Sequence, residues 1–452
     1  MSNRCRASVV IVAILLTGCA AQPPGPATFL TYAPTPPMGW NSYDTFGDSV
    51  TEAEVLANAL YMRDHLRSHG WQYVVVDFRW YDPGANSGNP NARAGAKLTA
   101  DEFGRLTPAP DRFPSAYNAD GFARLAEQIH AMGLKFGIHV MRGIPQQSVR
   151  ANTPIEGADF HAVDAANTAS ICAWCKDMYG VRGDTPAGQA WYDSIVRQYA
   201  RWGVDYIKVD DLSQPYSAAE VAALRNAIDK CGRPMVLSLS PGETPIADAE
   251  HVKTHANLWR ISNDFWDRWR FLNRQFDLIA RWQGVGGPGH WPDADMIPLG
   301  HIAIRDNAGG GGDRRTRFTH DEQRTLMSMW ALAPSPLMLG MNMPDNDAWT
   351  LSLLTNDAVI AVDQDPLGAP AQLVGPRGNL EVWKKPLADG SLAVGLFNRT
   401  NATANVAVTW AQLGISGKRA VHDLWRNEDI PADDHLAADV PAHGAVLVRI
   451  VH

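Results

Sequence analysis

The segment "VDYIKVDD", residues 204–211, decides the fold, because a short apolar run in it ends in two adjacent aspartates. The helix-like stretch "GQAWYDSIVRQYARWG" (188–203) precedes it, and a second helix-like stretch (218–232) leads to the next apolar run, "PMVLSLS" (234–240). Short runs rich in Val and Ile between helical patterns are typical of strands buried on both faces of a parallel sheet. The segment therefore predicts one β/α unit of a repeating fold.

The same alternation continues in both directions along the chain. Strands are predicted at residues 36–43, 73–80, 135–140, 204–211, 234–240, 258–262, 290–296 and 336–341. A capping box, Thr51 with Glu54, marks the start of a helix between the first two. Eight β/α units in about 300 residues predict a (β/α)8 TIM barrel, which we place at residues 37–365.

A different pattern follows the barrel. The segments "NLEVWKKPL" (379–387) and "SLAVGLFNRT" (391–400) alternate apolar and polar residues with a period of two. Asp389-Gly390 between them is a hairpin signal. Residues 366–452 are therefore predicted to form a C-terminal antiparallel β-sandwich.

The N-terminus reads as an export signal. Two arginines precede an apolar run, Val9 to Leu16, that is too short to span a bilayer. The run closes with Leu-Thr-Gly-Cys19, which resembles a bacterial lipobox. We expect residues 1–18 to be a lipoprotein signal peptide, Cys19 to carry lipid and the Pro-rich residues 19–36 to form a tether. The protein would then be a lipid-anchored cell-envelope protein, in the outer membrane or periplasm; a plain secretory signal is the alternative.

Composition excludes several classes of function. The chain has 452 residues, a formal net charge of −8 and no basic stripe, so we expect no nucleic-acid partner. Cys172-Ala-Trp-Cys175 is a lone CxxC without a second CxxC or a His pair at zinc spacing. No metal and no cofactor are predicted, and the pairing of Cys172, Cys175 and Cys231 stays open.

Carboxylates gather where the predicted strands end. Active sites of TIM barrels lie at the C-terminal ends of the strands. The acids at these places are Asp77, Asp210, Asp211, Asp264, Asp293 and Asp295. Any one of them could be a helix cap or one partner of a salt bridge. Several together, without a metal-ligating His set, favour catalysis by carboxylates, of which glycoside hydrolysis by two carboxyl groups is one form.

Strand geometry separates the two aspartates of the opening segment. Side chains alternate between faces, so Lys208 and Asp210 share one face and Val209 and Asp211 the other. If Val209 packs outward, Asp210 points into the barrel mouth beside an ammonium group that lowers its pKa. Asp210 is therefore the predicted nucleophile. For Asp211, capping a turn and contacting a substrate hydroxyl both remain open.

Asp264 is the predicted acid/base. Arg260 lies four residues earlier, and Trp259, Phe265 and Trp266 flank it. We expect these aromatic side chains to raise the pKa of Asp264 by desolvation, as a proton donor requires.

Five segments in this order resemble glycoside hydrolase family 27, the α-galactosidase family of clan D. They are "PPMGWNSY", "WGVDYIKVDD", "LWRISNDFWD", "PGHWPDADMIPLG" and "WALAPSPLMLGMNM". The resemblance implies a barrel plus sandwich, no metal, and retaining hydrolysis of α-linked galactosides in oligosaccharides or polysaccharides. It implies Asp210 as nucleophile and Asp264 as acid/base. The substrate-binding positions that it implies are Trp40, Asp77, His139, Lys208, Ser240, Arg260 and Asp295.

Three departures from the family pattern concern the sugar. An Asp pair that grips the 4- and 6-hydroxyls is replaced by Asp77 and Phe78, a Tyr by His139, and an acidic residue by Ser240. The leading expectation is an exo-acting α-galactosidase. The alternatives within the family are an isomaltodextranase-type α-glucan hydrolase, a β-L-arabinopyranosidase and an α-N-acetylgalactosaminidase. Outside it, a non-catalytic carbohydrate-binding lipoprotein and a metal-dependent barrel hydrolase are remote alternatives.

Overall fold

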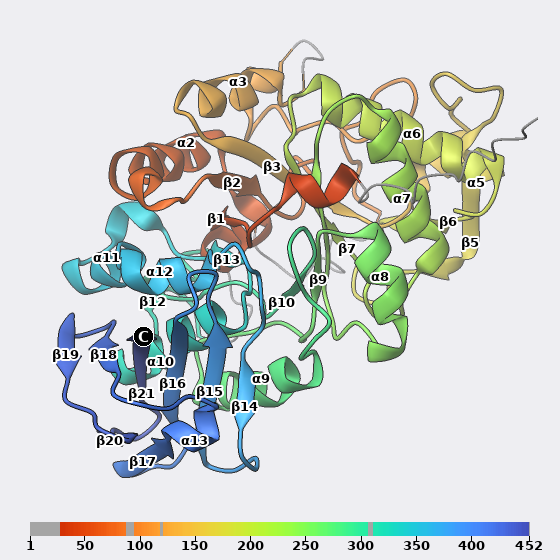
Figure 1. Cartoon of the computed structure of the whole chain (residues 1–452). Coiled ribbons are helices and arrows are strands. Elements are labelled where there is room, and N and C mark those ends of the chain that lie inside the picture. Colours follow the sequence, from red (N-terminus) through yellow and green to blue (C-terminus); the bar gives the residue numbers. More distant parts are fainter. Residues whose placement is uncertain (1–27, 87–94, 118–120, 306–310, 452) are drawn as a thin grey trace, which may run out of the picture.

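Eight parallel strands form the central sheet of the protein in a computed structural model that describes residues 28–86, 95–117, 121–305 and 311–451 (Figure 1). The strand order is β10-β9-β8-β7-β3-β2-β1-β13. The bounds are β1 (Met38–Asn41), β2 (Tyr73–Val76), β3 (Lys135–Met141), β7 (Tyr206–Asp210), β8 (Val236–Leu239), β9 (Leu258–Arg260), β10 (Trp291–Asp293) and β13 (Leu337–Leu339). A parallel bridge between Ile297 and Leu339 joins the two edges. The predicted barrel is confirmed, with a strand at each predicted segment; β3 extends one residue beyond its segment, to Met141.

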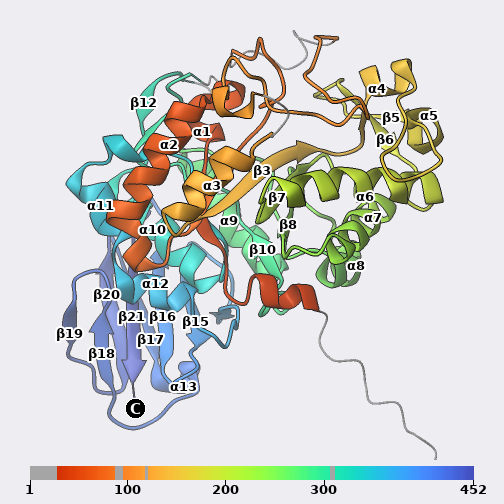
Figure 2. The same ribbon diagram turned by 90° about the horizontal axis from the view of Figure 1, so that it is seen from above.

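Helices cover the outside of the barrel (Figure 2). They include α2 (Glu52–Tyr61), α3 (Ala123–Ala131), α6 (Pro186–Arg201), α7 (Ala218–Lys230), α8 (Ala249–His255), α9 (Trp269–Arg281) and α10 (His320–Leu332). The capping box of Thr51 and Glu54 is present at the start of α2. A small three-stranded sheet, which the sequence did not predict, lies beyond the end of β3. Its strands are β4 (Ile144–Pro145), β6 (Met178–Val181) and β5 (Ala166–Ile171).

The N-terminal end of the barrel is closed by the short helix η1 (Thr28–Tyr32). The Asn257 side-chain amide donates a hydrogen bond to the Phe29 carbonyl oxygen at 2.9 Å. The Trp291 indole N–H donates to the Ala33 carbonyl oxygen at 2.9 Å. Because Asn257 and Trp291 stand at the beginnings of β9 and β10, η1 covers the end of the barrel opposite to the end where an active site is expected.

The C-terminal β-sandwich is also confirmed. Six antiparallel strands form one sheet: β14 (Gln372–Val374), β15 (Leu380–Pro386), β16 (Leu392–Asn398), β21 (Ala445–Val451), β18 (Ala420–Asp423) and β19 (Glu428–Ile430). β17 (Ala404–Thr409) pairs with β20 (His435–Val440). The two domains are joined through polar contacts, among them a 2.8 Å hydrogen bond from the Trp425 indole to the Ser328 hydroxyl on α10.

Two further expectations concern the chain's relation to membranes and its cysteines. The predicted signal peptide, the predicted tether up to residue 27 and Cys19 lie outside the described residues. Among the helices that the structure describes, none is long and apolar enough to cross a bilayer. Cys172, Cys175 and Cys231 are free thiols.

Candidate active site

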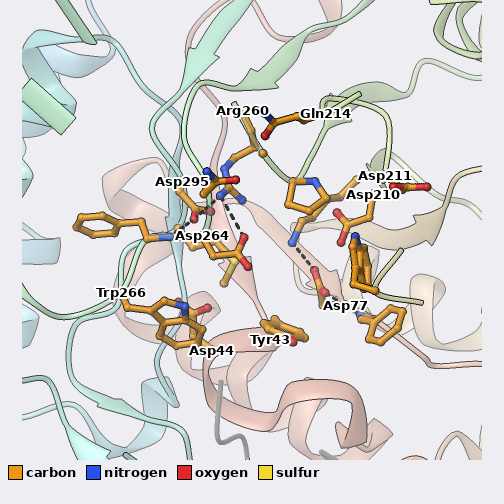
Figure 3. Close-up of a pocket in the computed structure, with 18 residues that line it drawn as sticks. Tyr43, Asp44, Asp77, Asp210, Asp211, Gln214, Arg260, Asp264, Trp266 and Asp295 are labelled. Carbon is orange, nitrogen blue, oxygen red and sulfur yellow. Dashed lines mark hydrogen bonds and ion pairs between the residues drawn. The ribbon is translucent and has the colours of Figure 1, made fainter. Parts of the chain in front are cut away.

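A cavity of about 320 Å³ opens at the C-terminal ends of the barrel strands (Figure 3). Its lining combines carboxylates, two cations and several aromatic side chains. They include Tyr43, Asp44, Asp77, Phe78, Trp174, Lys208, Asp210, Asp211, Arg260, Asp264, Phe265, Trp266 and Asp295. Asp77, Asp210 and Asp211 lie to the right in Figure 3, and Asp264 and Asp295 lie to the left. Such a cavity has room for one sugar ring and can place carboxyl groups on both sides of it.

Asp210 ends β7 and is buried, with 12% of its side chain exposed. The His139 imidazole on β3 lies 3.0 Å from it through Nε2, and the Ser240 hydroxyl donates a hydrogen bond to its other oxygen. Burial alone would raise the pKa of Asp210. The His139 imidazole and the Lys208 ammonium outweigh burial and hold this pKa well below its ordinary value. Asp210 of the free protein is therefore an ionised carboxylate near neutral pH, as a nucleophile must be.

Lys208 shares a face of β7 with Asp210, as strand alternation predicts, and both line the cavity. Its ammonium donates to Asp77 at 2.9 Å, and the Asn41 amide donates to the same Asp77 oxygen at 2.5 Å. Burial would raise the pKa of Asp77, but Lys208 holds it below its ordinary value. A chain of fixed charges thus runs from Asp77 through Lys208 to Asp210.

Asp264 lies in the loop after β9 and has 61% of its side chain exposed. The Arg260 guanidinium donates to it at 3.2 Å. The prediction that the flanking aromatic side chains desolvate the Asp264 carboxyl group is wrong. Trp259 is fully buried and Phe265 and Trp266 are nearly so, yet they leave the Asp264 carboxyl open to water.

Asp295 shares Arg260 with Asp264. The guanidinium lies 2.7 Å from Asp295, whose carboxylate also accepts the backbone N–H of Phe265 at 2.7 Å. Burial raises the pKa of Asp295 to about 7, against the opposing charge of Arg260. Asp295 therefore holds the loop that carries Asp264. Asp293, also named among the strand-end acids, does not line the cavity and accepts the N–H of Asp295 at 2.8 Å.

Trp40 requires a correction. Its side chain is fully buried and its indole N–H donates to the Met341 carbonyl oxygen at 2.7 Å, so it does not line the cavity. Tyr43, three residues later, does. His139 and Ser240 are likewise buried, but both touch Asp210.

One wall of the cavity is apolar. Phe78 follows Asp77 directly, and its ring packs edge-on against Trp174 with centroids 5.7 Å apart. Trp174 stands between the two cysteines of the CxxC motif, in the loop from β5 to β6. Both thiols are buried and free, and Trp174 between them lines the cavity. No group of three metal-ligating side chains occurs among the residues that the structure describes.

Two family models match the chain. Residues 179–365 match the model for alpha galactosidase A, and residues 377–450 match the alpha galactosidase C-terminal beta sandwich domain. The α-galactosidase of Cyamopsis tetragonoloba is 30% identical over 417 residues, which cover 90% of this chain and 84% of that protein. The α-galactosidase A of Cellvibrio japonicus is 29% identical, with 93% of each chain covered.

A solved structure is more similar still. It is a family 27 β-L-arabinopyranosidase from Geobacillus stearothermophilus in complex with arabinose, 48% identical, with a TM-score of 0.91 over 94% of this chain and 99% of that one. The chain belongs to glycoside hydrolase family 27. Membership of family 27 makes it a glycoside hydrolase of the α-galactosidase type, and it confirms the resemblance drawn from the five sequence segments.

Proposed function

We propose that the protein is an exo-acting, retaining glycosidase that removes terminal β-L-arabinopyranosyl groups in preference to α-D-galactosyl groups. The two sugars have the same ring configuration, and the pentose lacks the hydroxymethyl group at C5. The observation that carries the proposal is Phe78. It lines the cavity beside Asp77, where the family pattern has a second aspartate for the sugar's outer hydroxyls.

Phe78 and Trp174 together favour the pentoside. A hydroxymethyl group that faces two aromatic rings finds no hydrogen-bond partner, and an unpaired buried hydroxyl costs binding free energy. A pentose presents only a ring methylene there. Asp77, held by Lys208 and Asn41, remains available for a ring hydroxyl. The 48% identity to the β-L-arabinopyranosidase supports the same assignment.

The α-galactoside is the second candidate substrate. The curated relatives at 29–30% identity are α-galactosidases. The reacting part of the cavity, with its ionised Asp210 and open Asp264, treats both sugars alike, because their configuration at C1 to C4 is the same.

The mechanism proceeds by two displacements at C1. Asp210 attacks C1 while Asp264 gives its proton to the leaving oxygen, so the glycosidic bond breaks and a glycosyl ester forms. Asp264, now a carboxylate, takes a proton from water. The hydroxide adds to C1, the ester bond breaks, and Asp210 is an anion again. Lys208 and His139 stabilise that anion, and Arg260 keeps Asp264 within reach of the leaving oxygen.

A panel of nitrophenyl glycosides tests the proposal. We expect a higher kcat/KM on the β-L-arabinopyranoside than on the α-D-galactopyranoside, and none on the α-glucoside. Phe78→Asp should shift the ratio of the two kcat/KM values toward galactoside by roughly tenfold or more. Phe78→Ala, which makes room without adding an acceptor, is the matched control. A wild-type preference for the galactoside would contradict the pentoside assignment.

We also propose that Cys19 is lipidated and anchors the protein in the cell envelope. The lipobox-like sequence supports this, and so does the position of η1 at the end of the barrel opposite to the cavity. A tether that starts there would leave the cavity facing away from the membrane. Cys19→Ser should move the protein from the membrane to the soluble fraction and abolish labelling by a fatty acid. A wild-type protein that is already soluble would contradict it.

A further inference from the structure

Asp211 has an unusual backbone conformation for its place in the site. It follows Asp210 directly and has φ 67°, in the left-handed region that residues other than glycine rarely adopt. Aspartate and asparagine tolerate this region best. Its side chain does not cap a turn. It turns to the end of the neighbouring strand β3, while the residue still lines the cavity.

Arg142 holds Asp211 in this conformation. Its Nε and Nη2 atoms donate to one oxygen of Asp211 at 3.0 Å and 2.7 Å. Its backbone N–H donates to the carbonyl oxygen of Asp210 at 2.9 Å. Arg142 therefore holds the chain directly after the Asp210 side chain at two points, once through its backbone and once through its guanidinium. That arrangement limits the directions in which the Asp210 carboxylate can point.

Glu220 fixes the guanidinium from the other side. Nη1 of Arg142 donates to Glu220 at 2.7 Å and to the Ser170 hydroxyl at 3.0 Å. Glu220 in turn accepts the Tyr192 hydroxyl and the backbone N–H of Val181. Arg142, Asp211 and Glu220 each have 8% or less of the side chain exposed, so the triad is buried.

The triad also holds the small sheet that carries Trp174. Ser170 belongs to β5 and Val181 to β6, the two strands between which the Trp174 loop runs. One guanidinium thus joins the end of β3, the end of β7, the start of α7 and the strand β5. The nucleophile and the aromatic wall of the cavity share a single buried support.

We propose that Asp211 is a positioning residue of the reaction. Together with Arg142 and Glu220 it fixes the direction of the Asp210 carboxylate, and it makes no contact with the sugar. The proposal rests on the assignment of Asp210 as nucleophile under the proposed function. A shift of a reacting atom by about 1 Å costs roughly a hundredfold in rate, so the effect belongs in the chemical step.

The first test uses Asp211→Asn, which keeps a side chain that tolerates the left-handed backbone but removes its charge. We expect kcat to fall by at least about tenfold, while KM and inhibition by free arabinose or galactose stay within about threefold. Unchanged kcat would overturn the proposal. A weaker inhibition constant with unchanged kcat would also overturn it, since Asp211 would then contact the sugar.

The second test asks whether the residues act as a unit. Arg142→Met leaves the Asp211 charge buried without its partner and should lower kcat by at least about a hundredfold. Adding Asp211→Asn removes that charge and should restore kcat by at least about tenfold relative to Arg142→Met alone. A double variant no better than Arg142→Met would overturn the proposal. The control is Arg105→Met, which removes another buried guanidinium, paired with Asp101 at 2.7 Å and away from the cavity. It should lower the melting temperature and leave kcat unchanged.

The two proposals fail in different ways. Every variant is compared with the wild-type protein on whichever glycoside of the panel the wild type cleaves. A wild type that cleaves neither the arabinopyranoside nor the galactoside counts against the proposed function. A normal kcat for Asp211→Asn on a cleaved glycoside counts against the positioning role alone.

Discussion

Asp210 and Asp264 face the same cavity, yet 12% of the first side chain is exposed and 61% of the second. The Asp210 carboxylate contacts the His139 imidazole and the Ser240 hydroxyl, and the Lys208 ammonium lies nearby. Asp264 has one guanidinium, shared with Asp295. The difference matches the two tasks. A nucleophile must be an anion held in one direction when it attacks C1, whereas an acid/base must lose a proton to the leaving group and take another from water.

Removing the charge of the Asp210 carboxylate should have the largest effect on kcat. Asp210→Asn cannot form the glycosyl ester, so we expect kcat to fall by on the order of 10⁴ or more on every substrate. Circular dichroism and the melting temperature check that the fold remains. A variant that retains more than about a tenth of the wild-type rate would contradict the nucleophile assignment.

Asp264→Asn should show a loss that depends on the leaving group. Protonation by a positioned acid contributes about 10² to 10⁴ in rate. A dinitrophenyl leaving group needs no proton, so its release should suffer far less than that of an unactivated sugar. Comparing kcat/KM across a series of leaving groups measures this. An equal loss on all leaving groups would contradict the assignment of Asp264 as the acid, and with it the difference in role between the two carboxyl groups.

His139→Asn should sharpen the contrast through pH. The His139 imidazole is one of the groups that hold the pKa of Asp210 down, so its removal raises that pKa. A raised pKa leaves less ionised Asp210 in acid. Activity should therefore be unchanged near neutrality, and as the pH falls it should be lost at a higher pH than in the wild type. At the most acidic values the rate should be about tenfold below that of the wild type. The measurement is the acid limb of kcat/KM against pH.

Ser240→Ala is the matched control, because it removes a donor to Asp210 without removing a charge. Its acid limb should move less than that of His139→Asn. If both variants leave the acid limb unchanged, the groups next to Asp210 do not set its ionisation, and the explanation given for its low pKa is wrong.

Much of this site follows from strand alternation. The rule that places Lys208 and Asp210 on one face needs only the register of a single strand, and the structure agrees. The barrel strands were predictable for a similar reason. Most of them belong to short apolar runs, such as Tyr73–Val76, that are buried on both faces and stand between helical patterns.

The rest depends on contacts between distant segments. Asp211 and Arg142 are 69 positions apart, and no local pattern links them. The strand β5, with the sequence Ala-Asn-Thr-Ala-Ser-Ile, is polar and partly exposed, so it carries neither an apolar run nor a clean alternation. The sequence did not predict Trp174 as a cavity residue, because the signal in its segment is the CxxC motif and nothing local places the indole in the cavity. The exposure of Asp264 could not be predicted from the aromatic side chains next to it in sequence, because those side chains are buried without covering its carboxyl group.

Trp40 gives the smallest kinetic effect and tests the boundary between site and core. The side chain lies behind the cavity, where its indole N–H pairs with the Met341 carbonyl oxygen. Trp40→Phe should leave kcat and KM within about twofold, while the unpaired carbonyl costs about 1–3 kcal/mol of unfolding free energy. Denaturant unfolding and steady-state kinetics on one preparation separate the two quantities. A rise in KM without a loss of stability would show that Trp40 contacts the substrate. Tyr43 would then not be the aromatic residue after β1 that contacts the sugar.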